Sequence, residues 1–194
     1  HIPSALRLKG RLEVAALERS FNAVAARHES LRTTFAEHGE TFCQVIHPQL
    51  PLSISLTPLP AGLDAAGAEA AIKTFVESET ARPFNLQQGP LLRVALLQVA
   101  PDDHVLVLIQ HHIISDGWSM QVMVDELVQL YAAYSQGQTL QLPALAVQYA
   151  DYAAWQRQWM EAGEKARQLD YWRELLGGEQ PVLELPFDHQ RPAV

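Results

Sequence analysis

The sequence has 194 residues and a mass of 21.6 kDa, enough chain for one domain with its own apolar core. Hydrophobic residues make up 48% and charged residues 19%, which excludes a disordered or collagen-like chain, and no apolar run reaches the roughly 18 residues of a membrane-spanning helix. The formal net charge of −8 argues against nucleic acid and anionic membranes as partners.

Cys43 is the only cysteine, so an internal disulfide is excluded. The low cysteine content and the lack of a secretory leader favour a reducing, cytoplasmic location. Because Cys43 lies in the apolar stretch FCQVI, we expect a small buried side chain here rather than a nucleophile.

Hydrophobic periodicity and turn residues predict the elements of the first half of the chain. In chain order these are a strand over 4–9, a helix over 13–29, a strand from about residue 31 to 35, a turn at His38-Gly39 with a return strand over 41–47, a short strand among the prolines at 48, 51, 58 and 60, and a helix over 65–80.

The second half begins with two strongly apolar strands, over 91–99 and 104–110. The later strand is apolar at almost every position, which is typical of a central strand covered on both faces. Helices are predicted over 117–135, 146–162 and 164–176, and an extended linker over 181–194. Three tryptophans in the last two helices are interpreted as core or lobe-packing residues rather than as a stacking platform: Trp155, Trp159 and Trp172.

The segment most suggestive of chemistry is HHIISDGWS, residues 111–119. It lies between the predicted central strand and a helix, where open sheets commonly bind ligands. Adjacent side chains on extended backbone point to opposite faces, so one of His111 and His112 is expected to be chemical and the other structural. A neutral imidazole near pH 7 suits proton removal from an amine, a hydroxyl or a thiol. Two structural alternatives remain, namely a histidine pair without chemistry and an Asp116 that only caps the helix.

If Asp116 is buried, it needs a cationic partner to stay ionised, and we expect Arg27 first and Arg32 second. The alternatives are a helix C-terminal cap for Arg27 and a solvated strand position for Arg32. A zinc site is not expected, because His112 and Asp116 would supply at most two ligands. Motifs of serine hydrolases, P-loop NTPases and dinucleotide-binding proteins are absent from the sequence.

Three motifs in register resemble the condensation domains of nonribosomal peptide synthetases. The segment at 111–119 is similar to the family's His-His-x-x-x-Asp-Gly signature. The segment RHESLRTTF at 27–35 is similar to its Arg-His-Glu-x-Leu-Arg-Thr-x-Phe motif. The segment YADYAAWQ at 149–156 is similar to its Tyr-x-Asp-Tyr-Ala-x-Trp-Gln motif. The resemblance implies an α/β fold of the chloramphenicol acetyltransferase-like type, an α+β two-layer sandwich with a central mixed sheet flanked by helices.

The resemblance also implies a division of the chain. Residues 1–180 would form the N-terminal lobe without the family's first motif, and 181–194 a linker towards an absent C-terminal lobe. In the family the active site lies in a tunnel between the lobes, which the phosphopantetheine arms of carrier proteins enter from both sides. The implied partners are therefore the donor and acceptor peptidyl carrier proteins and the C-terminal lobe. The 4′-phosphopantetheine belongs to the carriers, and no cofactor or metal is expected on the chain itself.

The implied reaction is peptide-bond formation, in which the acceptor's α-amine attacks the donor thioester, in an enzyme of the chain-elongating type that prefers an L-configured donor. His112 is expected to take a proton from the amine or to position it, His111 to be structural, Asp116 to act electrostatically, and Gly117 to allow close approach. The residues implied to support the site are Arg27, Arg32, Trp118 and Ser119.

Two further expectations follow from the resemblance, and two alternatives to it stay open. The chain by itself should be inactive, because half of the tunnel is missing, and an uncovered lobe face should favour self-association. One alternative is a noncatalytic condensation-like module that recruits a carrier protein or a tailoring enzyme. The other is a stand-alone coenzyme A-dependent acyltransferase.

Overall fold

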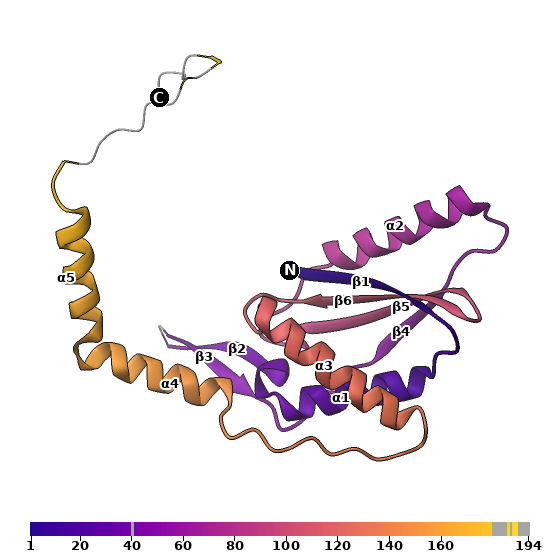
Figure 1. Ribbon diagram of the computed structural model, residues 1–194, viewed down its shortest axis with the longest axis horizontal. Helices are drawn as coiled ribbons and strands as arrows, with labels where there is room; N and C mark the ends of the chain where they lie inside the picture. The colour runs from indigo at the N-terminus through magenta and orange to yellow at the C-terminus, as the bar shows by residue number, and fades with distance from the viewer. Residues whose placement is uncertain (40, 180–185, 187, 190–194) are drawn as a thin grey trace. The chain divides into compact units, whose positions relative to one another are not determined.

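The computed structural model describes residues 1–39, 41–179, 186, 188 and 189 (Figure 1). Contacts divide the chain into two units, residues 1–150 and 151–194, and each is described by itself. Apart from residues 186, 188 and 189, the predicted linker over 181–194 lies outside the described residues.

The centre of the first unit is a four-stranded mixed sheet (Figure 1). Its strands lie in the order β1-β6-β5-β4 and are β1 (Ile2–Lys9), β6 (Asp103–Gln110), β5 (Leu92–Ala100) and β4 (Ile54–Pro58). β6 pairs antiparallel with β1 and β5, and β4 pairs parallel with β5. Every residue of β6 after Asp103 is buried, which confirms the central position predicted from its continuous apolar pattern.

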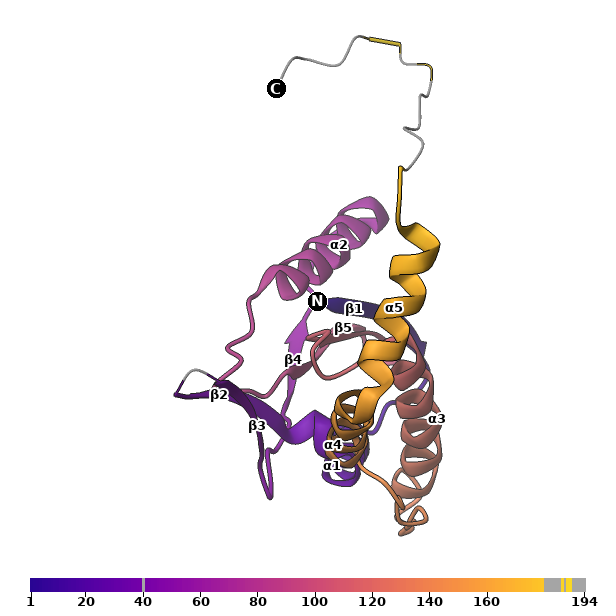
Figure 2. The same ribbon diagram turned by 90° about the vertical axis from the view of Figure 1, so that its left-hand side faces the viewer.

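Helices cover both faces of this sheet (Figures 1 and 2). α1 (Val14–Arg27) and α3 (Gly117–Tyr134) pack on one face through a cluster that includes the fully buried Phe21 and Leu96. α2 (Ala65–Ala81) packs on the other face, where Phe75 contacts a second cluster of strand residues. The mixed sheet flanked by helices is confirmed, and α2 adds a third layer to the predicted two-layer sandwich.

α1 forms because apolar residues recur every three or four positions, at Leu17, Phe21 and Val24, and these are the side chains it buries. Full burial of a side chain such as Phe21 contributes roughly 1.5–3 kcal/mol to stability. The helix ends at Arg27, and after the extended residue His28 a 3-10 turn follows, η1 (Glu29–Arg32), which the periodicity did not predict. The Thr33 hydroxyl closes that turn by donating to the Glu29 carbonyl oxygen over 2.7 Å, so the following strand begins at Thr33.

β2 (Thr33–His38) and β3 (Thr41–Ile46) form the predicted hairpin as a separate two-stranded sheet. Gly39 in its turn has a φ of 64°, a conformation that glycine adopts readily. The prediction that Cys43 is buried is wrong. β3 is one of only two strands in this sheet and its residues 41–45 are all exposed, because no layer covers them within the described part of the chain.

The second unit contains most of α4 (Tyr149–Trp159), the turn η2 (Met160–Glu164) and α5 (Lys165–Leu176). Gly163 interrupts η2 with a φ of 118° and separates the two helices. Trp155 and Trp159 stack with ring centroids 5.6 Å apart, yet they are 55% and 42% exposed, and Trp172 is 51% exposed. These tryptophans are not core residues of the described unit, and the lobe-packing alternative stays a prediction. None of the described helices is long and apolar enough to cross a membrane.

Candidate active site

The histidine loop, residues 111–116, connects the central strand β6 to α3. Its first residue is fixed to the sheet, because the His111 N–H donates to the Leu91 carbonyl oxygen over 2.9 Å. The His111 carbonyl oxygen then accepts the Ile114 N–H over 3.1 Å, which closes a turn. The loop ends at Asp116, the N-cap of α3. Both ends of the loop are therefore held by regular structure.

The His111 side chain is half-buried. Its Nδ1 accepts the Ile113 N–H over 3.1 Å, and its ring meets the Phe84 ring edge-on with centroids 6.0 Å apart. Burial lowers the pKa of His111, and the N-terminal amine and His112 lower it further. A neutral ring that accepts a backbone N–H suits the structural role predicted for His111.

The His112 side chain is exposed, in contrast to its neighbour. No side-chain hydrogen bond within the described residues holds its ring. The two histidines thus differ in burial, since His111 is half-buried and His112 is exposed. The His112 ring is therefore accessible from solvent.

Asp116 caps α3 and is exposed. Its Oδ1 accepts the Ser119 N–H over 2.8 Å and the Ser119 hydroxyl over 2.7 Å. The hydroxyl bond is the largest cause of a lowered Asp116 pKa, and the Ser119 N–H and the charge interaction with His112 act in the same direction. Asp116 is therefore ionised at neutral pH.

The predicted ion pair between Asp116 and an arginine is wrong. Arg27 instead binds Glu126, with Nε 2.9 Å from Oε1, and Arg32 binds Glu29, with Nη2 3.3 Å from Oε1. The prediction assumed a buried carboxylate, but Asp116 is exposed to water and held by Ser119, so it needs no cation. Arg32 also donates to the His47 carbonyl oxygen over 2.5 Å, which ties η1 to the end of the hairpin.

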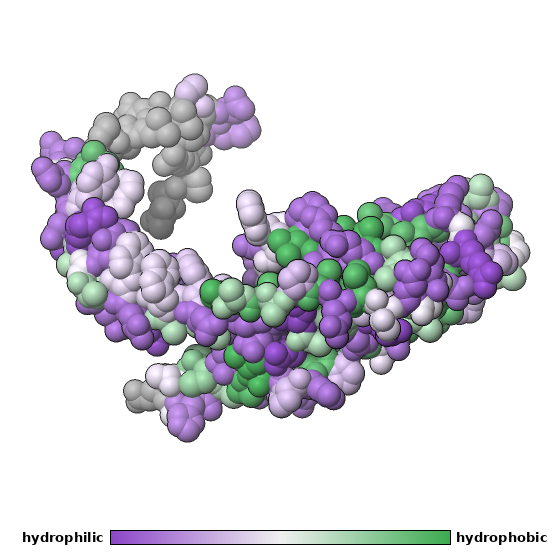
Figure 3. All heavy atoms as spheres, turned by 60° about the horizontal axis from the view of Figure 1, so that its bottom comes forward, coloured by the Kyte–Doolittle hydropathy of each residue, from purple (hydrophilic) through white to green (hydrophobic). Residues whose placement is uncertain are grey.

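The first turn of α3 is open. Gly117 has no left-handed φ, and a Cβ added to it would meet no atom within 4 Å. Trp118 is 83% exposed, and the side chains of Ile113 and Val122 are also exposed. Figure 3, turned so that the lower side of Figure 1 comes forward, shows hydrophobic residues in green among hydrophilic residues in purple on this face of the molecule. Within the described residues, no group of three side chains is placed to hold a metal ion.

Comparisons with known proteins point to the family that the three sequence motifs resemble. The family model of the condensation domain matches residues 1–194. One polypeptide of the linear gramicidin synthase of Brevibacillus parabrevis is 47% identical over 197 residues, and malpinin synthetase of Mortierella alpina is 43% identical over 194 residues. Each match covers 100% of this chain and 2% of the much longer relative.

Solved structures agree in fold. The X-domain from teicoplanin biosynthesis is 35% identical with a TM-score of 0.83, and the match covers 100% of this chain and 42% of that one. The starter condensation domain of rhizomide synthetase is 24% identical with a TM-score of 0.79, over 92% of this chain and 42% of that one. This chain thus spans less than half of either solved chain. The match of the family model over every residue shows that the chain belongs to the condensation domain family.

Proposed function

We propose that this chain supplies the histidine-bearing part of a condensation domain that forms peptide bonds in nonribosomal peptide synthesis. The observation that carries the proposal is the exposed His112 at the end of a buried central strand, beside an ionised Asp116. The similarity to gramicidin and malpinin synthetases supports the same reaction. Residues 1–180 are proposed to be the N-terminal lobe of that domain.

In the proposed reaction the acceptor's α-amine attacks the carbonyl carbon of the donor thioester. An α-amine has a pKa of about 8, so at neutral pH it is mostly protonated and must lose a proton to attack. His112 takes this proton or holds the neutral amine, and Asp116 stabilises the positive charge that the ring gains. The C–S bond of the tetrahedral intermediate then breaks, and the carrier thiolate leaves and recovers a proton. Placing the two reactants in one site contributes roughly 7–11 kcal/mol to lowering the barrier.

The proposed partners are the donor and acceptor peptidyl carrier proteins and a C-terminal lobe that completes the site. The 4′-phosphopantetheine arms of the carriers bring both substrates, and the chain itself binds no cofactor in this scheme. By resemblance to the family, the retained histidine pair and Trp118 directly before Ser119 favour the chain-elongating type. Glu29 and the Ile113-Ile114-Ser115 sequence favour an L-configured donor by the same resemblance.

The test is condensation by the parent polypeptide with both carriers preloaded. The wild-type protein should form the amide product, and His112→Ala should lower the rate by at least ~10-fold to 100-fold, in line with the loss of an acid/base or positioning contact. A noncatalytic module that recruits a tailoring enzyme would form no amide with either protein. The solved X-domain that occurs in a complex with OxyB makes this control worth including.

A further inference from the structure

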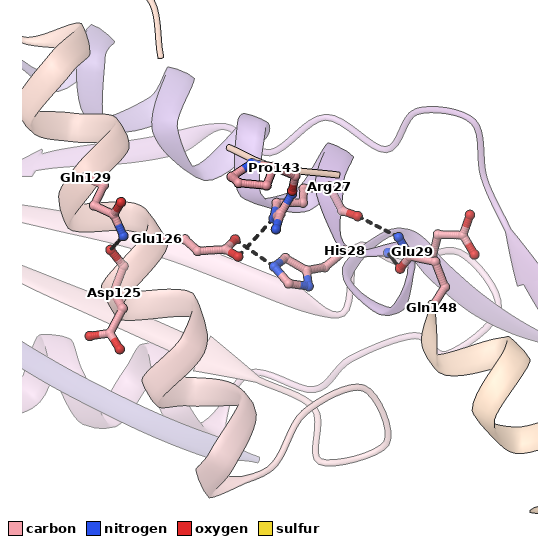
Figure 4. A network of polar contacts seen from close by, with 8 residues as sticks. All are labelled: Arg27, His28, Glu29, Asp125, Glu126, Gln129, Pro143 and Gln148. Atoms are coloured by element: carbon pink, nitrogen blue, oxygen red, sulfur yellow. Dashed lines mark hydrogen bonds and ion pairs between the residues drawn. The ribbon is translucent and has the colours of Figure 1, made fainter. Parts of the chain in front are cut away.

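Glu126, in the middle of α3, contacts the C-terminal end of α1 (Figure 4). Its Oε1 accepts from Arg27 Nε over 2.9 Å, and its Oε2 lies 2.7 Å from His28 Nε2. The exposed fraction of the side chain is only 12% for Glu126, 17% for Arg27 and 21% for His28. One carboxylate therefore binds the last residue of α1 and its C-cap, largely shielded from water.

A third segment joins this network. The Arg27 guanidinium also donates to the Pro143 carbonyl oxygen (Figure 4). Gln148 binds the same end of α1 through both atoms of its amide, because Nε2 donates to the Arg27 carbonyl oxygen over 3.0 Å and Oε1 accepts the Glu29 N–H over 3.1 Å. The end of α1 thus connects α3 to the segment that leads into α4.

These contacts are directional, unlike the apolar contacts of α3. Met123, Leu127 and Leu130 bury α3 against the core, but apolar contacts do not fix the rotation or the axial position of a helix strongly. Hydrogen bonds between charged groups require a narrow geometry. A shielded ion pair adds little net stability, because desolvation offsets the attraction, so its contribution here lies in the geometry it sets.

The geometry of α3 bears directly on the histidine loop. α3 begins at Gly117, one residue after Asp116, and Glu126 follows nine residues later, about 14 Å along the helix at ~1.5 Å per residue. A rotation or shift of α3 moves Asp116 relative to His112, whereas β6 holds His111 in place. The placement of the helix therefore sets the placement of the charge beside His112.

We propose that Glu126 is a positioning residue for the condensation reaction, which holds α3 on α1 so that Asp116 and His112 keep their relative positions. This inference rests on the proposed function. The contact acts through α3 and does not require Glu126 to touch a substrate.

The first test compares Glu126→Gln with Asp125→Asn in the parent polypeptide. Glu126→Gln keeps the shape of the side chain but removes the negative charge that binds Arg27 and contacts His28. Asp125→Asn removes the same charge one residue earlier, where the Asp125 side chain accepts only from Gln121 within α3, over 2.8 Å. Glu126→Gln should lower kcat by ~10-fold with an unchanged KM for the loaded acceptor carrier, and Asp125→Asn should stay within ~2-fold of wild type.

The second test does not depend on activity. Amide hydrogen exchange at Ile113 and Ile114, whose N–H groups bond to His111, should be at least ~10-fold faster in Glu126→Gln and unchanged in Asp125→Asn. If the wild-type protein forms no amide, the proposed function fails, and the exchange data still test the positioning.

Arg27→Lys is the second variant, because it keeps the charge and loses the planar fork that reaches both Glu126 and Pro143. It should show the same loss in kcat and the same faster exchange. Unchanged exchange and an unchanged kcat in both variants would overturn the proposal. Unfolding of both variants at 25 °C would also overturn it, since the pair would then be required for the fold itself.

Discussion

Replacing Gly117 with alanine should separate stability from activity. Gly117 is the first residue of α3, its φ is not left-handed, and an added Cβ meets no atom within 4 Å. The folded chain therefore has room for the methyl group. A glycine to alanine change at such a site lowers the entropy of the unfolded chain and stabilises a protein by about 0.4–1 kcal/mol. For a chain of this length the melting temperature should rise by about 1–4 °C.

The same methyl group should impair the reaction. The open space at Gly117 lies next to the ionised Asp116 in the sequence, and we expect the reacting thioester to approach the backbone there. A displacement of about 1 Å is sufficient to lower the rate ~100-fold. We therefore expect Gly117→Ala to lower the single-turnover rate of condensation by ~10-fold to 100-fold, while the protein becomes slightly more stable.

Thermal unfolding and single-turnover condensation with preloaded carriers measure the two effects on the same preparation. Gly89→Ala is the contrasting variant, because Gly89 has a φ of 61° and its added Cβ would lie 2.9 Å from Thr34 Cγ2. It should destabilise the protein by more than about 1 kcal/mol. A wild-type rate in Gly117→Ala would show that no substrate approaches this backbone, and a lower melting temperature would refute the interpretation of the site as open.

Three other variants or conditions test separate parts of the account. His111→Ala should lower the free energy of unfolding by about 1 kcal/mol, because the Ile113 N–H loses its acceptor. Folding lowers the His111 pKa, so wild type should lose stability as pH falls below about 6.5, and urea titrations of His111→Ala should not show that loss. Asp116→Asn keeps an acceptor for the Ser119 N–H, so it should remain folded but react more slowly. Folding lowers the Asp116 pKa, so wild type should lose the stability contributed by this charge only as pH falls below about 4. Acid titrations followed by circular dichroism should not show that loss in Asp116→Asn. Residues 1–194 by themselves should form no amide from loaded carriers, and addition of the remainder of the domain should restore activity, whereas product from the chain alone would refute the shared site.

The regular elements of the first unit could be predicted because their signals are local. β6 is apolar along nearly its whole length, and α1 repeats apolar residues at helical spacing, so strand and helix follow from the pattern itself. The glycine turn at Gly39 has a similarly local cause. The histidine loop was located for the same reason, because it joins two elements that the pattern defines.

Partners in space could not be predicted in this way. Asp116 lacks the predicted arginine because Arg27 is bound by Glu126, which comes from a helix 99 residues further along the chain. One signal was present, since Glu126 lies between Met123 and Leu130 on the buried stripe of α3 and a carboxylate there requires a cation. The sequence does not say which cation meets it.

Burial also depends on what covers an element. Cys43 has apolar neighbours, but β3 belongs to a two-stranded sheet and its first five residues are exposed. The tryptophans of α4 have the spacing of a buried face, yet Trp155 and Trp159 stack on each other at the surface of the described unit. In both cases the sequence pattern predicts which side of a strand or helix is apolar, but it does not predict whether another element covers that side.

The most direct test of the central claim is the ratio of two single-turnover rate constants in the parent polypeptide, with both carriers preloaded and each variant shown to be folded at the assay temperature. His112→Ala removes the exposed ring and His111→Ala the half-buried one, so the pair compares adjacent residues of the same type. We predict that His112→Ala reacts at least ~10-fold to 100-fold more slowly than wild type and that folded His111→Ala stays within ~3-fold. Equal rates for His112→Ala and wild type would contradict the assignment of His112 to the reaction.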